Sequence, residues 1–424
     1  MSHILITFLG KGDTDTDGLY QHEQYHFEND NTPYYETNFF CLAVLEHLKN
    51  KGSPPDKLVI LGTPSSMWNA LYEIKGEVED DYEDEWVALA DAIEENTEYP
   101  EEEEIEEEKI TEYFPTLQKF LTKYLEINCE LRVIPYGESQ EKQIVILEKI
   151  AESVKENDTV SLDITHGSRH LPMLVIVSAM YLEIVKKVTI ADIYYGAMEM
   201  KNRHNGIAPA LNLKGMLGIA NWFGALKSFE KDGDYGVFAD LLETDGLTKN
   251  QTKPLKDAAF FERIFNISQA ARKLTTFRNN VQEDLPGIGY LFTDTLKNRI
   301  KWSENNSLYG HQRALAFSFL EKKDYFRATN LAVEAFITKL MLMSGDNPKE
   351  DIRYRQRIVA DYFLHGKAGG DRGKISDFRL LRKLRNMLVH SDMLQSEIER
   401  IIESNNPQQS LESTLRKLMK HLLD

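Results

Sequence analysis

The first two hundred residues alternate between short apolar runs rich in β-branched side chains and longer stretches in which apolar residues recur at helical spacing. The apolar runs predict strands at residues 3–9, 57–61, 129–135, 159–164 and 188–195. The longer stretches predict helices at residues 36–49, 115–126 and 141–152, and an apolar helix from Leu171 onward. Apolar strands that alternate with helices indicate a parallel sheet covered on both faces, which is a doubly wound, Rossmann-like α/β fold. A partly alternating segment over residues 19–27 is compatible with an added hairpin near the first strand.

From about Asn205 onward, apolar residues recur only at helical spacing, and we expect helices alone. A polar stretch over residues 297–310 separates this part from a last helical region. We therefore predict three parts: an α/β domain over residues 1–204, a helical connector over 205–300 and an all-α C-terminal domain over 301–424.

The composition is that of a soluble globular protein. A chain of 424 residues is too long to fold around a single hydrophobic core, so we expect two or three domains. No apolar run approaches about 18 residues, so no membrane span is expected. The first residues lack the basic and apolar segments of a secretion signal. Cys41 and Cys129 are too few for a disulfide framework, so we expect two reduced thiols in a cytoplasmic protein.

The net charge of −18 argues against a nucleic-acid partner until its distribution along the chain is considered. Residues 77–108 contain 18 acidic residues and no Lys or Arg, so the rest of the chain carries 50 acidic and 50 basic residues. We interpret this stretch, extended to about residue 110, as a solvated and mobile insertion. Residues 353–385 carry ten basic residues against three acidic ones, and this local patch is what a nucleic acid would meet.

Two expected strand ends carry polar residues suited to a ligand. The strand at 57–61 leads into Gly62-Thr63-Pro64-Ser65-Ser66, where Thr63 can cap a helix and Pro64 suits its first turn. The strand at 159–164 leads into Thr165-His166-Gly167-Ser168-Arg169. Amides and hydroxyls at a helix start favour an anion or the polar edge of a nucleotide, and Arg169 can pair with phosphate or stack on a base. The first segment is equally well explained as an ordinary helix start, whereas the second is hard to attribute to capping alone.

The carboxyl ends of parallel strands are where such domains bind ligands. The candidate ligand-binding residues are Gly10, Thr63, Pro64, Ser65, Ser66, Thr165, His166, Gly167, Ser168 and Arg169. The glycine of the first strand end is the weakest signal among them, since no dinucleotide fingerprint or phosphate loop follows it. No paired cysteines or HExxH pattern is present, so we expect no metal site.

The candidate catalytic residues, Arg385, Asn386 and His390, lie on one expected helix near the C-terminus. The buried face of that helix is predicted by leucines at i, i+3 and i+7: Leu381, Leu384 and Leu388. At 100° per residue, His390 falls nearly opposite these leucines, and Asn386 shares its face. A histidine buried for packing would lie on the leucine stripe, so this one is either a catalytic or interface residue or an idle surface residue.

An arginine and a histidine without a metal suit RNA cleavage by the 2′-hydroxyl, because the guanidinium stabilises charge on the phosphoryl oxygens and the imidazole handles a proton. The same spacing occurs at Arg416 and His421, but that pair lacks the asparagine and lies in the last residues, where fraying is expected. We therefore favour Arg385 and His390.

Together these features resemble the CRISPR-associated CARF–HEPN ribonucleases of type III CRISPR systems. The segments 62–68 and 163–169 resemble strand-end motifs of the CARF sensor domain, and Arg385-Asn386-x-x-x-His390 resembles the HEPN catalytic motif. The resemblance covers nearly the whole chain in the right order. It implies a CARF domain, a connector and a HEPN domain, and it assigns no role to the acidic stretch.

The resemblance further implies a homodimer, or a higher even-numbered oligomer, whose paired CARF domains bind one cyclic oligoadenylate. Cyclic tetraadenylate is the activator expected from it. Binding would activate a composite HEPN site that cuts single-stranded RNA without a metal or cofactor and leaves a cyclic phosphate and a 5′-hydroxyl. Arg385, Asn386 and His390 would be catalytic, and residues 63–66 and 165–169 would line the ligand site.

Two other functions stay open at this point. The helical domain could be catalytically silent and act as a dimer or RNA-binding module, which would make the chain a nucleotide sensor that regulates by binding. Alternatively, the α/β domain could hydrolyse its own ring ligand, since Ser, Thr and His residues near a bound ring are compatible with that chemistry.

Overall fold

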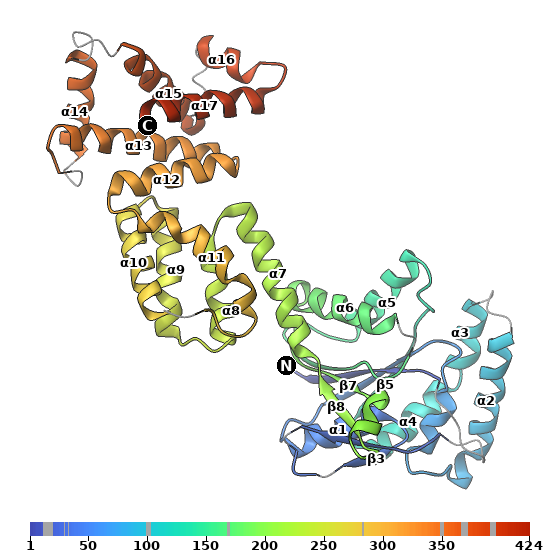
Figure 1. The fold of residues 1–424 in the computed structure, drawn as a ribbon. Helices are drawn as coiled ribbons and strands as arrows, with labels where there is room; N and C mark the ends of the chain where they lie inside the picture. The colour runs from blue at the N-terminus through green and yellow to red at the C-terminus, as the bar shows by residue number, and fades with distance from the viewer. Residues whose placement is uncertain are drawn as a thin grey trace. The chain divides into compact units, whose positions relative to one another are not determined.

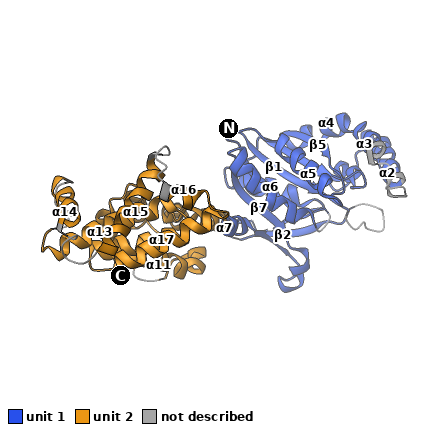
Figure 2. Cartoon of the chain, turned by 90° about the horizontal axis from the view of Figure 1, so that it is seen from above, with its two compact units in different colours: residues 1–220 blue, residues 221–424 orange. Residues whose placement is uncertain are grey.

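The computed structural model describes residues 1–11, 20–28, 30–32, 34–98, 103–167, 170–281, 284–347, 352–365, 372–390 and 396–424. These residues form two compact units, residues 1–220 (unit 1) and residues 221–424 (unit 2), which Figure 2 shows in different colours. Unit 1 contains the sheet, and the described part of unit 2 is helical (Figure 1).

Unit 1 is built on an eight-stranded sheet with the strand order β3-β2-β8-β7-β6-β1-β4-β5. Five neighbouring strands are parallel: β7 (Thr189–Gly196), β6 (Thr159–Asp163), β1 (His3–Leu9), β4 (Lys57–Gly62) and β5 (Asn128–Val133). They match the five strands predicted from the apolar runs to within two residues at each end. The parallel sheet is therefore confirmed, and the carboxyl ends of these strands meet at one edge.

The other three strands make the sheet mixed. β8 (Ala208–Asn212) runs antiparallel to β7, β2 (Glu23–Phe27) runs parallel to β8, and β3 (Tyr35–Thr37) runs antiparallel to β2. A hairpin thus exists, but β8, β7 and β6 separate it from β1, so its expected place near the first strand is wrong. The expectation of helices alone after Asn205 is also wrong. The sequence does not predict β8 because the Ala-Pro-Ala segment within it has weak strand propensity.

Helices cover both faces of the sheet (Figure 1). The four helices involved are α1 (Phe40–Asn50), α4 (Phe114–Leu125), α5 (Gln140–Glu152) and α6 (Leu171–Val185). Leu5 of β1 belongs to the hydrophobic cluster that contains residues of α1 and α4. Its neighbours Ile4 and Ile6 belong to a second cluster, with residues of α5 and α6. A strand buried on both sides in this way confirms the doubly wound α/β fold.

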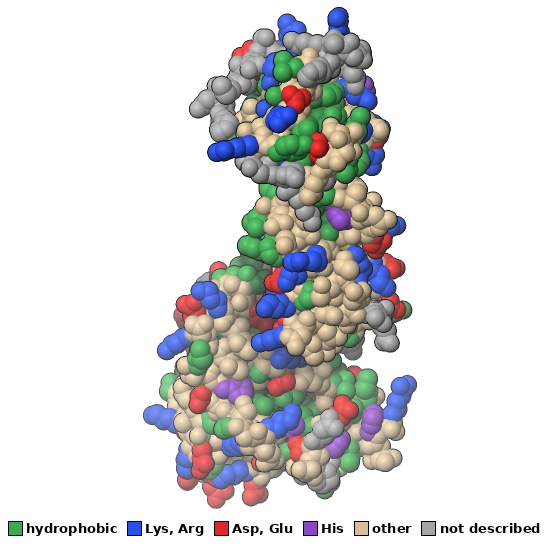
Figure 3. Space-filling view, turned by 90° about the vertical axis from the view of Figure 1, so that its left-hand side faces the viewer, with side chains coloured by type: hydrophobic (Ala, Val, Ile, Leu, Met, Phe, Trp, Pro, Cys, Tyr) green, Lys and Arg blue, Asp and Glu red, His purple; other side chains and the backbone are tan. Residues whose placement is uncertain are grey.

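The acidic stretch is folded where the structure describes it. It forms the short 3-10 helix η2 (Asp80–Tyr82), α2 (Glu83–Glu98) and α3 (Glu103–Thr111). Leu89 and Ile110 are fully buried in the same hydrophobic cluster as Trp68. The expectation of a solvated segment is therefore wrong at Leu89 and Ile110, because apolar residues at helical spacing anchor these helices. That the stretch is an insertion stays a prediction. On the face drawn in Figure 3, basic, acidic and apolar side chains are interspersed, so the net charge of −18 does not give this face one sign.

The helix α7 (Lys214–Asp232) spans the boundary between the units. The remaining α-helices are α8 (Phe238–Thr244), α9 (Lys249–Arg263), α10 (Ile267–Asn280), α11 (Thr293–Ile300), α12 (Leu308–Glu321), α13 (Tyr325–Met343), α14 (Ile352–His365), α15 (Arg372–His390), α16 (Ser396–Ile402) and α17 (Pro407–Leu423). One hydrophobic cluster runs through unit 2 from Trp222 to Leu423, so the residues on both sides of position 300 share a core. The all-α character of the C-terminal part is confirmed, and its HEPN identity stays a prediction.

Candidate functional site

A cavity of about 340 Å³ lies at the carboxyl ends of β1, β4 and β6. Its lining residues are Leu9, Gly10, Lys11, Thr63, Ser65, Ser66, Tyr136, Gly167 and Leu171. Five of the predicted ligand-binding residues are therefore brought together around one cavity. It lies at the edge of the sheet where doubly wound domains bind their ligands.

Two loops in the cavity wall approach each other too closely for a side chain between them. A Cβ atom added at Gly10 would lie 2.5 Å from the backbone nitrogen of Gly167. Gly167 itself has a φ of +102°, a conformation that other residues rarely adopt. Backbone geometry thus requires both glycines, and they present bare main chain to a ligand.

The segment after β4 folds back onto the end of β1. The Ser66 hydroxyl donates to the Leu9 carbonyl oxygen (2.8 Å) and accepts from the Thr63 amide (2.9 Å). The Trp68 indole donates to the Thr63 carbonyl oxygen (3.0 Å), and the 3-10 helix η1 (Trp68–Glu73) begins only there. The expectation that Thr63 caps a helix and Pro64 occupies its first turn is therefore wrong. Ser65 is half-exposed and forms no hydrogen bond with a described residue, so its hydroxyl is available to a ligand.

The polar side chains after β6 tie the strands together. The buried Asp163 carboxylate accepts from the Thr7 hydroxyl of β1 (2.7 Å) and from the Thr165 amide (2.9 Å). The Thr165 hydroxyl in turn accepts from the amide of Gly196 in β7 (2.8 Å). Thr165 thus holds β6 to β7, and it does not line the cavity.

His166 completes the start of α1. Its Nε2 atom accepts from the amide of Phe40 (3.3 Å), one of the amides that a helix start leaves unpaired. Burial lowers the pKa of His166 against the opposing charge of Asp163, and burial raises the pKa of the Asp163 carboxyl. The imidazole is therefore neutral near pH 7, and in this structure it acts as a helix cap outside the cavity lining.

The three remaining predicted ligand-binding residues are not among the described residues that line the cavity. Pro64 is buried and is not part of the lining. Ser168 and Arg169 lie outside the described residues.

Four lining residues are not among the predicted ligand-binding residues. Leu9 is the last residue of β1, and Lys11 lies two residues after it, so the end of the strand is a signal for both. Tyr136 comes from the loop after β5, and its carbonyl oxygen is hydrogen-bonded to His170 Nε2 (2.8 Å). Leu171, the first residue of α6, gave no signal beyond its hydrophobicity.

The second group of candidate residues lies on α15. Leu381 and Leu384 are fully buried there, as predicted, and so is Phe378 one turn earlier. The third predicted residue of the apolar face, Leu388, is only half-buried. On the other side, Asn386 is exposed and Arg385 is half-buried, and the Arg385 Nε atom donates to the Asn386 Oδ1 atom (3.0 Å).

The third candidate, His390, is the last residue of α15, and its side chain lies outside the described part of the structure. Of the predicted catalytic trio, the structure therefore shows the side chains of Arg385 and Asn386. For His390 it shows only the position at the end of the helix, four residues after Asn386.

Further basic residues lie close to Arg385. Burial, followed by the neighbouring charge of Arg385, lowers the pKa of Arg382. The guanidinium groups of Arg379 and Arg382 lie over the Phe363 ring, 5.1 and 5.8 Å from its centroid. Arg385 itself forms no ion pair with any described residue, so its charge is not neutralised there.

The competing Arg–His pair of α17 is engaged within the protein. Arg416 forms ion pairs with Glu321 and Glu412, and the His421 Nδ1 atom lies 2.6 Å from the Asp377 carboxylate. The expected fraying of these residues is wrong, because α17 buries a stripe of leucines and Met419 in the core. Arg416 and His421 instead differ from Arg385 in that both have carboxylate partners.

Among the described residues, no cluster of three or more His, Cys, Asp or Glu side chains could hold a metal ion. No described helix is long and apolar enough to cross a membrane.

Comparison with known proteins bears on the first unit directly. Residues 4–199 match the family model for the CARF domain of the CRISPR system endoribonuclease Csx1. The chain is also similar to the CRISPR-associated protein MJ1674 of Methanocaldococcus jannaschii, with 24% identity over 436 residues. That similarity covers 99% of this chain, which spans 66% of the length of the relative. The matched range contains the three strand ends that form the cavity, so unit 1 is similar to a CARF domain at the residues that form this site.

Proposed function

We propose that the chain is a metal-independent endoribonuclease activated by a cyclic oligoadenylate. The proposal is carried by the Arg385–Asn386 pair on the outer side of α15, in a chain that contains a CARF domain. Arg385 is held by Asn386 yet has no carboxylate partner among the described residues. A guanidinium that is positioned but not neutralised is suited to a phosphate on which negative charge develops.

The proposed reaction needs no group beyond side chains and the RNA itself. The 2′-hydroxyl attacks the adjacent phosphorus, the bond to the 5′-oxygen breaks, and a cyclic phosphate and a 5′-hydroxyl result. Arg385 stabilises the charge on the phosphoryl oxygens, and Asn386 orients Arg385. His390, at the end of the same helix, transfers a proton or orients the attacking hydroxyl near neutral pH.

The surface of α6 supports a homodimer. Met173, Val177, Tyr181 and Ile184 lie at spacings of four, four and three residues, and 37% to 75% of each side chain is exposed. Such a stripe on one helix is the kind of face that a partner covers. Because α6 begins at the cavity wall, a second copy on this face would bring two cavities close together.

The size of the cavity supports a shared ring ligand. About 340 Å³ is near the lower limit for small-molecule sites, so one cavity holds only part of a cyclic oligoadenylate. Two symmetric cavities suit a symmetric ring, and cyclic tetraadenylate is the ring that we expect. Ser65, Lys11 and the backbone at Gly10 and Gly167 would contact it.

The decisive experiment is an RNase assay in EDTA with cyclic tri-, tetra- and hexaadenylate tested in parallel. We expect cleavage of single-stranded RNA with one ring size and a cyclic phosphate at the new 3′ end. Loss of activity in EDTA would contradict the metal-free mechanism. Absence of cleavage with every ring would favour a catalytically silent sensor.

Two variants assign the site. The double variant Arg385→Ala/His390→Ala should lose cleavage and keep dimerisation and ring binding, whereas Arg416→Ala, with the same spacing to a histidine, should keep cleavage. Linear products formed from the ring by the double variant would reveal a ring-hydrolysing activity in the CARF domain.

A further inference from the structure

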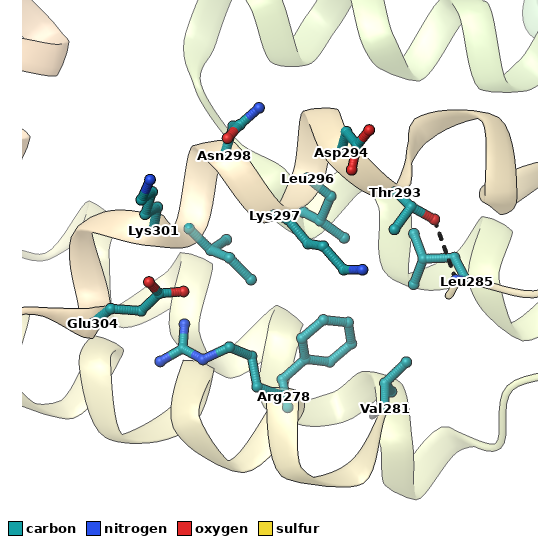
Figure 4. Close-up of a pocket in the computed structure, with 12 residues that line it drawn as sticks. Arg278, Val281, Leu285, Thr293, Asp294, Leu296, Lys297, Asn298, Lys301 and Glu304 are labelled. Carbon is teal, nitrogen blue, oxygen red and sulfur yellow. Dashed lines mark hydrogen bonds between the residues drawn. The ribbon is translucent and has the colours of Figure 1, made fainter. Parts of the chain in front are cut away.

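A second cavity, of about 590 Å³, lies in unit 2 between α10 and the segment formed by α11 and the 3-10 helix η6 (Lys301–Glu304), as Figure 4 shows. Its floor is apolar, because Phe277, Leu285, Leu296 and Ile300 line it with only 2% to 6% of their surface exposed. No motif of the sequence and no step of the proposed reaction uses this cavity.

Basic side chains stand along its rim. In Figure 4, Arg278 and Lys297 extend into the space between the helices, whereas Asp294 points away from it. Arg278 donates to the Ser303 hydroxyl (2.7 Å) and forms no ion pair with a described residue. Lys301 also lacks an ion-pair partner among these residues.

The third cation of the rim is only weakly engaged. Lys297 lies 3.1 Å from the Asp284 carboxylate, but both side chains are more than half exposed. Exposed pairs of this kind contribute little and exchange easily. The rim can therefore offer three positive charges to an anion.

The same rim holds an acceptor. Glu304 lines the cavity beside Arg278, and it forms no ion pair with a described residue. A ligand that suits all these groups has an anionic group, an apolar flat body and hydroxyl or amine donors. A fatty acid or a simple carboxylate lacks the donors, whereas a nucleotide has all three.

We infer that this cavity binds one nucleotide, with its phosphate at Arg278, Lys297 and Lys301, its base on the apolar floor and its ribose hydroxyls near Glu304. The inference rests on the proposed function, because the RNA substrate is one source of such a nucleotide, and a free nucleoside monophosphate is the other. As an RNA site it would anchor the substrate away from α15 and favour long RNAs over short ones.

The test is an equilibrium binding measurement on Arg385→Ala protein, which does not cut its ligand. Fluorescence anisotropy with a labelled unstructured RNA compares this protein with and without the added changes Lys297→Glu/Lys301→Glu. We expect RNA binding weakened by about tenfold and the slope of log affinity against log salt reduced by about 0.7, the value for one phosphate of a single strand. The matched control is Lys249→Glu/Lys253→Glu, which reverses two exposed charges on α9 outside the cavity and should change the affinity by less than about twofold.

Binding of AMP, measured by calorimetry on the same proteins, separates the two sources. Weakened AMP binding with unchanged RNA binding would assign the cavity to a free nucleotide. Unchanged binding of both ligands would overturn the inference. If the double variant fails to fold, Lys301→Gln removes one unpaired charge and should still weaken binding by about threefold.

These measurements use neither the activator nor cleavage, so they do not depend on ring binding. A wild-type protein that cuts no RNA with any ring overturns the proposed function without touching the binding data. Conversely, a protein that cuts RNA normally but binds both RNA and AMP equally well with and without Lys297 and Lys301 overturns only this inference.

Discussion

At the scale of single residues, the cavity of unit 1 is shaped by main chain more than by side chains. Gly10 and Gly167 touch backbone to backbone, and the Ser66 hydroxyl holds the turn after β4 to the Leu9 carbonyl. These contacts join residues that are 57 or more positions apart in the chain. A ligand in this cavity therefore meets amides whose positions depend on the absence of a Cβ atom.

Gly10→Ala should close this contact and impair activation. The added methyl group would lie 2.5 Å from the Gly167 nitrogen, so one loop must shift. We expect the ring concentration for half-maximal RNA cleavage to rise by about tenfold or more, as judged from the usual cost of a displaced binding loop. The control is Gly215→Ala on α7, where a Cβ atom meets nothing within 4 Å. Equal activation curves for both variants would show that the Gly10 loop does not contact the ring.

His166 is expected to make stability depend on pH. Its folded-state pKa is lowered by burial, so below the unfolded value of about 6.5 the unfolded chain binds a proton more readily than the native site does. Neutral His166 therefore makes its full contribution to the free energy of unfolding above that pH. The contribution declines as the pH falls further, by at most about 1.4 kcal/mol per pH unit.

His166→Gln keeps an acceptor for the Phe40 amide but does not titrate. Urea unfolding at a pH of about 7.5 and about 5.5 should therefore show a decline that is smaller in this variant by about 1 kcal/mol or more. His47 and His311, whose pKa values burial also lowers, are present in both proteins and cancel in the comparison. An identical decline in both proteins would mean that His166 is protonated equally in the folded and unfolded states.

At the scale of elements, what the sequence predicts depends on whether local patterning decides the structure. The five parallel strands were predicted because burial on both faces demands continuous apolar runs. The turn at Thr63–Ser66 was misjudged because its geometry comes from a hydrogen bond to distant Leu9. The faces of α15 were predictable at Leu381 and Leu384, since a regular helix converts spacing into direction.

In the candidate site, too, the residues predicted correctly are those whose role depends on local sequence. Gly10, Ser65 and Gly167 follow strands and are predicted from that position. Tyr136 directly follows the predicted strand 129–135, but its immediate neighbours in the loop are not polar residues that would mark it as a ligand site. Thr165 and His166 stood out for their chemistry, but that chemistry serves contacts to Gly196 and Phe40, which no local pattern reveals.

The exposed stripe of α6 yields a prediction at this scale. Val177→Glu places a charge in the middle of the stripe, where 56% of the valine is exposed. If α6 forms the dimer face, the dimer should dissociate at about tenfold or higher protein concentration than the wild type, because a buried unpaired carboxylate is costly. Analytical ultracentrifugation measures this directly. Val87→Glu on α2, where 44% of the valine is exposed, is the matched control and should leave the oligomeric state unchanged.

At the scale of the whole molecule, the proposed functions of sensing and cutting fall on units with separate cores. The cavity belongs to unit 1, whose two hydrophobic clusters flank the sheet, and α15 belongs to the single cluster of unit 2. Folding of one unit therefore does not depend on burying the other's core residues. The acidic stretch, with Leu89 and Ile110 in a core of unit 1, accounts for the whole excess of negative charge, so the charge of −18 is compatible with the proposed RNA substrate at α15.

Separate cores allow activation and chemistry to be changed independently. Ser66→Ala removes the hydrogen bonds that hold the cavity wall, so it should raise the activator concentration needed for half-maximal cleavage by about tenfold and leave the rate at saturation nearly unchanged. Arg385→Lys keeps the charge but loses the planar fork, so it should lower the saturated rate by about a hundredfold with an unchanged activation midpoint. Single-turnover RNA cleavage measured across activator concentrations separates the two parameters. If both variants shifted both parameters, ring binding and the conformation of α15 would belong to one tightly linked equilibrium. The ring would then have to act by changing the conformation of α15, and not by bringing together two preformed halves of a composite site.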